Sequence, residues 1–159
     1  MTASTSKARL VNQPALLIAG LRGHFSSSDP TGIPAQWQRL APHLGSIPGQ
    51  VGRVAYGVCL ATSPGFDYIS GVEVREGGSL PDGFQAVEIP AQRYAVFAHE
   101  EHVSQLFETI SKIWSTDLAA AGYRYRQPLP GGVSFFERYG EGFDPLTGRG
   151  DMEIWVPVE

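Results

Sequence analysis

Two carboxylates near the C-terminal end of the 159-residue chain stand beside aromatic residues. Glu137 lies two residues from both Phe135 and Tyr139, and Glu153 lies two residues before Trp155. Alternate side chains of a β-strand point to the same face, so each carboxylate would share a face with aromatic rings. The spacing therefore predicts acidic groups bordered by rings on the surface of a sheet.

An enclosed carboxylate among rings has a definite chemistry. Burial raises the pKa of a carboxyl because it disfavours the charged form. A cation stabilises the charged form instead, and each ring face adds roughly 0.5–2 kcal/mol of attraction for that cation. The pattern thus favours a site for a hydrophobic small molecule that is positively charged or donates a hydrogen bond. From the spacing alone the alternative stays open that each glutamate is solvated on an exposed face.

The strands that carry these glutamates are the last two elements of a strand–helix–strand–strand pattern that occurs twice in the sequence. In the first occurrence an apolar strand at residues 14–22 precedes a helix over residues 33–44, where apolar residues recur at helical spacing. Pro42 is expected to end or kink this helix. Strands at residues 53–60 and 66–75 follow.

The second occurrence begins with residues 84–98, which are predicted to form a strand that is interrupted near Pro90. Residues 103–121 carry the most regular apolar stripe of the chain, and we expect this helix to face a core. Strands at residues 133–139 and 152–158 complete the pattern.

Each strand–helix–strand–strand half is too small to bury both faces of its sheet, so the halves should share one core. The sequence therefore predicts an α+β fold, a pseudo-symmetric duplication of a βαββ unit in which two antiparallel-sheet halves carry one helix each. We expect residues 1–12 to form a flexible leader and residues 13–159 to form a single domain, with halves at about 13–78 and 79–159.

The composition argues against nucleic-acid-binding, membrane-spanning and secreted proteins. The net charge is −4, whereas nucleic-acid-binding proteins normally show a basic excess or stripe. The longest apolar run, residues 14–21, is far shorter than the roughly 20 residues of a membrane-spanning helix, and the polar N-terminus lacks a signal core. Cys59 is the only cysteine and is expected to be a reduced, buried thiol. We expect a cytoplasmic protein that binds neither nucleic acid directly nor membranes.

Five stretches of the sequence, taken in order, carry a resemblance to a known family. They are Tyr56-Gly57-Val58; Phe66-Asp67-Tyr68 with Gly71-Val72-Glu73-Val74; Ile89-Pro90-Ala91 with Tyr94-Ala95-Val96-Phe97; Phe136-Glu137 with Tyr139; and Phe143-Asp144-Pro145 with residues 152–158. Together they resemble the GyrI-like effector-binding domain, which also occurs at the C-terminus of many AraC-type and MerR-type transcription regulators. The resemblance covers nearly the whole chain from Pro14 on.

The resemblance implies a duplicated βαββ fold whose two halves enclose hydrophobic, often cationic, drug-like molecules in a cleft. It implies an acidic residue at the centre of that cleft, which the Phe-Glu-x-Tyr stretch assigns to Glu137, with Glu153 as the second candidate. The side chains expected to contact a ligand are Glu137, Glu153, Tyr68, Tyr139, Trp37, Trp114 and Trp155. Plain core packing remains the alternative for Trp37 and Trp114, because both continue apolar helical stripes.

Three functions follow, and the first is favoured. The domain is expected to bind a hydrophobic, cationic small molecule for sensing, sequestration or resistance. The resemblance also allows a hydrolase of reactive or strained toxins, in which Glu137 or Glu153 would act as general base and a tyrosine such as Tyr139 would donate to the leaving group. A third alternative is a regulatory domain that binds a protein partner such as a topoisomerase.

The resemblance also shows one departure. Regulators of this family carry a DNA-binding domain before the effector domain, whereas about a dozen residues precede the first predicted strand here. We therefore expect a stand-alone member, either a monomer or a homodimer. We expect no cofactor and no metal, since His99 and His102 are three residues apart, unlike the four-residue spacing of the zinc-protease motif.

Overall fold

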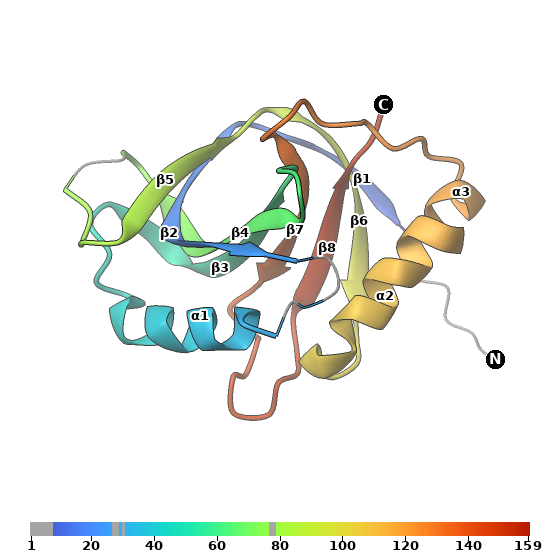
Figure 1. Ribbon diagram of the computed structural model, residues 1–159. Helices are drawn as coiled ribbons and strands as arrows, with labels where there is room; N and C mark the ends of the chain where they lie inside the picture. Colours follow the sequence, from blue (N-terminus) through green and yellow to red (C-terminus); the bar gives the residue numbers. More distant parts are fainter. Residues whose placement is uncertain (1–7, 27–28, 30, 77–78) are drawn as a thin grey trace.

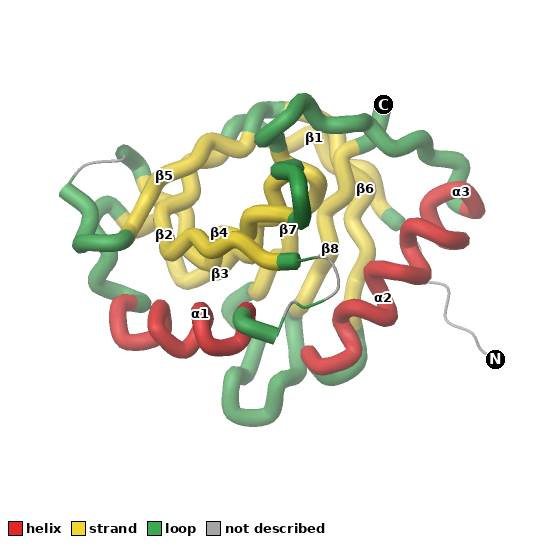
Figure 2. Tube along the Cα trace, in the orientation of Figure 1, coloured by secondary structure: helices red, strands yellow, loops and turns green. Residues whose placement is uncertain are grey.

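The computed structural model describes residues 8–26, 29, 31–76 and 79–159. Within this part of the chain eight strands form one antiparallel sheet in the spatial order β1-β6-β8-β7-β3-β4-β2-β5 (Figures 1 and 2). The strands are β1 (Arg9–Gln13), β2 (Leu16–Phe25), β3 (Gln50–Leu60), β4 (Phe66–Val74), β5 (Phe84–Ile89), β6 (Gln92–His99), β7 (Val133–Tyr139) and β8 (Met152–Pro157).

Each half contributes one helical segment, which confirms the predicted α+β class. In the first half α1 (Ile33–Leu40) has Pro34 in its first turn, where a fixed φ suits a helix start, and it gives way at Pro42 to the short 3₁₀ turn η1 (Ala41–His43). The second segment consists of η2 (Val103–Gln105), α2 (Leu106–Lys112), the π-helical turn η3 (Ile113–Asp117) and α3 (Leu118–Ala120). Among the described residues, the helices are all too short or too polar to cross a membrane.

Each half begins with a strand that bends at a Pro-Ala pair. The bend at Pro14-Ala15 separates β1 from β2, and the bend at Pro90-Ala91 separates β5 from β6. Proline has no N–H to donate to a strand ladder, which explains both interruptions. β1 pairs with β6 and β2 pairs with β5, so each half adds a strand to the sheet of the other. Backbone hydrogen bonds therefore join the halves in addition to their shared core.

The prediction that residues 1–12 form a flexible leader is wrong for residues 9–12, which belong to β1. Arg9 lies opposite Val96 in the ladder with β6, and Val11 packs against the buried core. The partner strand lies far along the sequence, so the local pattern of residues 9–12 does not reveal it. Residues 1–7 lie outside the described part of the chain.

The helical segments cover only parts of one sheet face. α1 contacts β2 and β4. Leu106, Ile113 and Leu118 of the second segment belong to a buried cluster with residues of β6 and β8. In the strand order β3 and β7 lie between these two covered areas, and the loop that joins β7 to β8 projects between α1 and α2 (Figure 1). Side chains of β3 and β7 on this face therefore lie between the two helical segments.

The opposite face of the sheet curls around an apolar core. Ile18 and Ile89 belong to the same buried cluster as Tyr94, although β2 and β5 lie far from β6 in the strand order. At the centre the ring of Phe136 stacks on Trp155 with centroids 5.3 Å apart and meets Tyr94 edge-on at 5.2 Å. The sheet is bent enough to enclose these rings, although its outer strands β1 and β5 do not pair with each other. The curled face of the central strands is therefore buried.

The apolar stripe predicted over residues 103–121 is only partly buried. Leu106 and Ile113 lie in the core, but 55% of Phe107 and 40% of Trp114 are exposed. Within η3 the N–H of Leu118 donates to the carbonyl of Ile113, five residues earlier, so Leu118 follows Ile113 into the core. The stripe prediction is therefore wrong for Phe107, and the core-packing alternative does not hold for Trp114. A π-helical turn shifts the register of the stripe, and such turns are frequent at functional sites.

Replacing the ring at the centre of the curled face should strongly reduce stability. Phe136 is 1% exposed, so Phe136→Ala is expected to lower the free energy of unfolding by about 3–5 kcal/mol in urea denaturation. Leu146→Ala is the matched control, because 95% of Leu146 is exposed and its loss should change stability very little. Equal stabilities of the two variants would contradict the assigned core.

Candidate functional site

Glu137 lies on the helix-bearing face of the sheet, in the middle of β7. In the ladders it is opposite Gly57 of β3 and Ile154 of β8. Phe135 and Tyr139 share its face by strand alternation, whereas Phe136 points into the curled core. Only 8% of Glu137 is exposed. The predicted arrangement, a carboxylate flanked by rings on one face of a strand, is therefore present in β7. The alternative that Glu137 is solvated on an exposed face does not hold.

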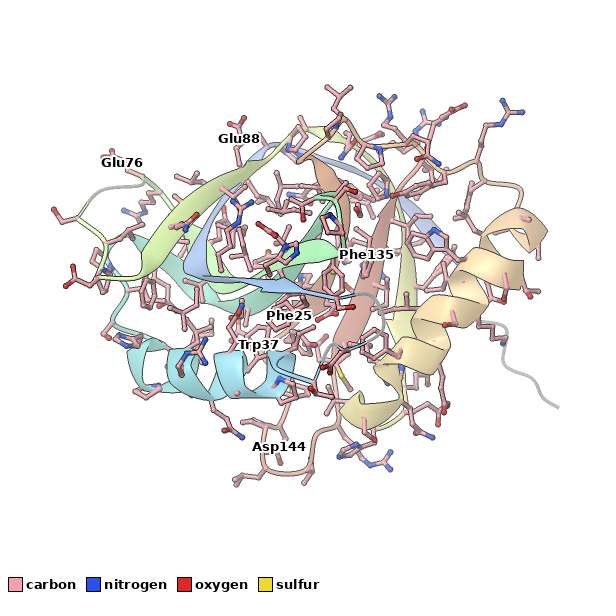
Figure 3. The ribbon with its side chains drawn as sticks, viewed as in Figure 1. Phe25, Trp37, Glu76, Glu88, Phe135 and Asp144 are labelled. Atoms are coloured by element: carbon pink, nitrogen blue, oxygen red, sulfur yellow. The ribbon has the colours of Figure 1, made fainter. Side chains whose placement is uncertain are left out.

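Three aromatic side chains from three elements surround this carboxyl. The hydroxyls of Tyr68 on β4 and Tyr139 on β7 both donate to the same oxygen, Oε1 of Glu137, at 2.7 and 2.8 Å. Trp37 of α1 donates from Nε1 to the Tyr68 hydroxyl at 3.0 Å and lies edge-on to Tyr139 with centroids 5.2 Å apart. Figure 3 shows Trp37 on the side of α1 that is turned toward the sheet. We call Trp37, Tyr68, Glu137 and Tyr139 the carboxyl cage.

Glycine at position 57 leaves the space in which the cage closes. A Cβ atom at Gly57 would lie 2.0 Å from the Tyr68 hydroxyl oxygen and 2.5 Å from Oε1 of Glu137. Both distances are far below van der Waals contact, so any larger residue would push the carboxyl and the phenol apart. Within the Tyr-Gly-Val stretch, Gly57 thus contributes to the cage because it has no side chain that would displace Tyr68 or Glu137.

A buried amide on α1 holds the tryptophan of the cage in place. Gln36 donates from Nε2 to the backbone carbonyls of Leu21 and Tyr68 at 3.0 and 3.1 Å and to the hydroxyl of Ser70 at 3.0 Å. These bonds fix the turn of α1 that carries Trp37 against β2 and β4. Gln36 is not among the site residues predicted from the sequence, although a polar residue on the inner face of a helix is the type of signal that could identify it.

The electrostatics of the cage follow from burial. Loss of solvation raises the pKa of Glu137 to about 7, although the hydrogen bonds from Tyr68 and Tyr139 act in the opposite direction. Burial, followed by the neighbouring Glu137 charge, raises the pKa of both tyrosines well above its usual value, so both remain neutral donors. Across residues 8–26, 29, 31–76 and 79–159, no ion pair to Glu137 is present. The carboxyl is therefore held by dipoles and not by a positive charge.

A second aromatic group lies beside the cage. Trp114 of η3 meets Phe135 edge-on at 5.2 Å and Tyr125 at 5.4 Å. Phe135 shares the face of Glu137 at a distance of about 7 Å along the strand. Cys59, opposite Phe135 in the ladder, is free and buried as predicted. The structure thus places Trp114 next to the cage, but outside contact with the carboxyl.

Glu153 and Trp155 are not part of this arrangement. They do share a face of β8, but Trp155 pairs with Phe136 and Glu153 pairs with Arg138, so both point to the side opposite Glu137. Glu153 forms ion pairs with Arg9 at 2.9 Å and Arg138 at 3.5 Å and accepts a hydrogen bond from Trp155. The expectation that Glu153 and Trp155 border the same cleft as Glu137 is therefore wrong, because alternation shows which residues share a face but not which face it is.

The cage leaves little of Glu137 open, because both phenol hydroxyls occupy its Oε1 and only a small part of its side chain is exposed. Two shallow hollows of the described structure lie elsewhere, one along residues 12–14 and 91–93 and the other along residues 98–100 and 150–153. Phe143, from the loop after β7, packs edge-on against Tyr139 at 5.1 Å and adds to the closure. A molecule in contact with the carboxyl would therefore have to displace at least one ring of the cage.

The tight fit at position 57 predicts a specific coupling. Gly57→Ala should lower the free energy of unfolding by about 1–3 kcal/mol, as overpacking does, and should shift the fluorescence of Trp37. In a Tyr68→Phe background, which lacks the phenol oxygen nearest the new methyl group, the same change should be milder. Urea denaturation of wild type, Gly57→Ala, Tyr68→Phe and the double variant measures this coupling. Additive effects would mean that Gly57 does not support the cage.

Stability should depend on pH through Glu137. Its pKa is about 7 in the folded protein and near the ordinary value of 4.5 in the unfolded chain, so between these values the folded state binds more protons. Stability is therefore expected to fall as pH rises through this window, by on the order of 3 kcal/mol in total. Glu137→Gln should lack this decline. A difference between wild type and variant that stays constant from pH 5 to pH 8 would contradict the raised pKa.

Comparison with known proteins places the chain among relatives of the same architecture. BrlR, a transcriptional regulator of Pseudomonas aeruginosa, is 34% identical over 154 residues, which cover 95% of this chain and 55% of BrlR. The chain thus spans about half the length of this curated relative. SAV2435, solved bound to tetraphenylphosphonium, aligns with a TM-score of 0.73 at 18% identity, covering 96% of this chain and 93% of that chain.

The C-terminal domain of EcmrR has the same fold, with a TM-score of 0.65 at 18% identity over 98% of this chain and 99% of that domain. A family model described as the GyrI-like small molecule binding domain matches residues 6–159. The chain therefore belongs to the GyrI-like small molecule binding domain family.

Proposed function

We propose that this domain binds hydrophobic molecules that carry a positive charge, with the charge next to Glu137. The observation that supports this proposal most directly is a buried carboxyl that accepts two phenol hydrogen bonds and has no ion-pair partner among the described residues. An ionised carboxylate in such a place is unfavourable on its own. A cationic ligand would supply the missing charge.

The rings of the cage suit the rest of such a ligand. The rings of Trp37, Tyr68 and Tyr139 lie next to the carboxyl and contact one another. An aromatic face attracts a cation by roughly 0.5–2 kcal/mol. Trp114, which is 40% exposed, and Phe135 extend this aromatic surface toward the second helical segment. A ligand with a central charge and aromatic substituents would contact both groups of rings.

One solved relative binds a ligand of this class. Tetraphenylphosphonium, which is bound to SAV2435, is a permanent cation surrounded by four phenyl rings. BrlR is a transcriptional regulator, and a ligand-binding domain in such a protein would serve to sense its effector. We infer that this domain recognises a cationic effector, for sensing or for sequestration.

Hydrolysis is the second candidate function, and one observation favours it. A carboxyl with a pKa of about 7 that contacts two neutral phenols has the properties of a general base with proton donors at hand. In this case Glu137 would activate water and Tyr68 or Tyr139 would donate to the leaving group. Recovery of the ligand after long incubation, unchanged or cleaved, distinguishes binding from turnover.

Removal of the charge at position 137 should weaken the binding of cations. For tetraphenylphosphonium at pH 8, Glu137→Gln is expected to raise the Kd about tenfold to a hundredfold, because an aromatic cage without a charge loses the Coulombic attraction. Isothermal titration calorimetry measures this change.

Two controls make the result specific. Glu153→Gln should leave the Kd within about twofold, since Glu153 lies on the other face of the sheet and is already paired with Arg9. Triphenylphosphine oxide, a neutral aromatic ligand, should bind wild type and Glu137→Gln equally. If Glu137→Gln binds tetraphenylphosphonium as tightly as wild type, the proposed role of the carboxyl is wrong.

A further inference from the structure

We propose that below neutral pH a proton leaves the site for each cation that enters it, so that Glu137 exchanges its own proton for the positive charge of the ligand. This inference rests on the proposed function and adds to it the way in which the site is regulated. It makes cation binding sensitive to pH near neutrality and leaves the binding of neutral molecules insensitive.

The first support is the set of groups that face the carboxyl. β7 contributes Tyr139, β4 contributes Tyr68, β3 contributes Gly57 and the thiol of Cys59, and β8 contributes the apolar Ile154. α1 contributes Trp37 through its bond to Tyr68, and the loop after β7 contributes Phe143 behind Tyr139.

These neighbours are all neutral. Burial, with the Glu137 charge as a smaller cause, raises the pKa of the Cys59 thiol well above its usual value, and the same causes keep both phenols protonated. In the part of the chain that the structure describes, no lysine, arginine or histidine forms an ion pair with Glu137. The protein therefore offers this carboxyl hydrogen bonds but no balancing charge, and a proton is what neutralises it when no ligand is bound.

The second support is the geometry of the two phenol bonds. Both hydroxyls donate to Oε1, at 2.7 and 2.8 Å, so neither of them engages Oε2. In a protonated carboxyl one oxygen carries the hydrogen and the other still accepts hydrogen bonds. With the proton on Oε2, Oε1 keeps both bonds in the neutral and in the ionised form. The cage thus holds either form of Glu137 without a change in its hydrogen bonds.

The exchange itself is balanced. The protonated carboxyl and a free monocation give a carboxylate paired with that cation and one proton released to solvent. A cation within about 4–6 Å lowers the pKa of a carboxyl by roughly 1–3, which reverses the effect of burial. By linkage, the affinity for a cation then rises with pH wherever the free site is protonated and the bound site is not.

Proton release can be counted directly. Tetraphenylphosphonium is titrated into the wild-type protein by calorimetry, in pairs of buffers with different ionisation enthalpies, at pH 6 and at pH 9. The dependence of the binding enthalpy on the buffer gives the number of protons released. We expect close to one proton at pH 6, close to none at pH 9, and an affinity about tenfold higher at pH 9.

Variants identify the source of the proton. Glu137→Gln should release no proton at either pH, whereas Cys59→Ser should release as many as wild type, which separates the carboxyl from the nearest thiol. Circular dichroism and urea denaturation confirm that each variant is folded. Triphenylphosphine oxide should release no proton from any of the proteins.

The outcomes separate the two proposals. Tight binding of tetraphenylphosphonium at pH 6 without proton release would overturn the exchange and leave the proposed function intact. Release that persists in Glu137→Gln would assign the proton to another group and also overturn the exchange. Failure of wild type to bind the cation at either pH would overturn the proposed function and the exchange together.

Discussion

A carboxyl that is buried among rings and lacks a cation is the feature on which this site depends. Glu137 receives two phenol hydrogen bonds, which lower its pKa, yet loss of solvation dominates and raises that pKa to about 7. Because desolvation outweighs the hydrogen bonds, the charged form is incompletely stabilised in the closed site. In the proposed function, the same imbalance would attract a molecule that brings its own positive charge. Affinity and pH sensitivity would then have one physical origin.

The fold creates this situation through the arrangement of its two halves. The ladder between β3 and β7 joins the halves into one continuous sheet, and β1 and β5 each add an edge strand to the sheet of the other half. α1 covers β2 and β4, while the second helical segment packs over β6 and β8. The carboxyl cage closes at the place where the two covered areas meet, with glycine at position 57 providing room for its polar atoms. Duplication thus produces a site that neither half could form alone.

Much of this could be predicted from the sequence, and the failures have identifiable reasons. Alternation along β7 correctly placed Glu137 with Phe135 and Tyr139, because strand periodicity is a local property. The same periodicity grouped Glu153 with Trp155 but could not assign their face, which is set by the ladder between β7 and β8. Long-range pairing also explains why the local pattern of residues 9–12 predicts a leader, whereas the structure places them in β1.

The cage shows a second limit of sequence reasoning. Gly57 acts through space left free, which has no local pattern. Gln36 acts through contacts with distant strands, and its only local signal is a polar side chain on the inner face of a helix. In the π-helical turn Leu118 follows Ile113 into the core at a spacing of five residues, and the regular stripe over 103–121 does not reveal this shift or the exposure of Trp114. In the sequence only the family resemblance links Trp37 and Tyr68 to Glu137.

The ionisation of Glu137 is the most direct measure of this account. Carbon-13 NMR of the side-chain carboxyl, assigned by comparison with Glu137→Gln, follows its titration in the free domain and in the presence of saturating tetraphenylphosphonium. We expect a midpoint near pH 7 in the free domain and a clearly lower midpoint with the cation bound. A midpoint near the ordinary value of 4.5 in the free domain would contradict it.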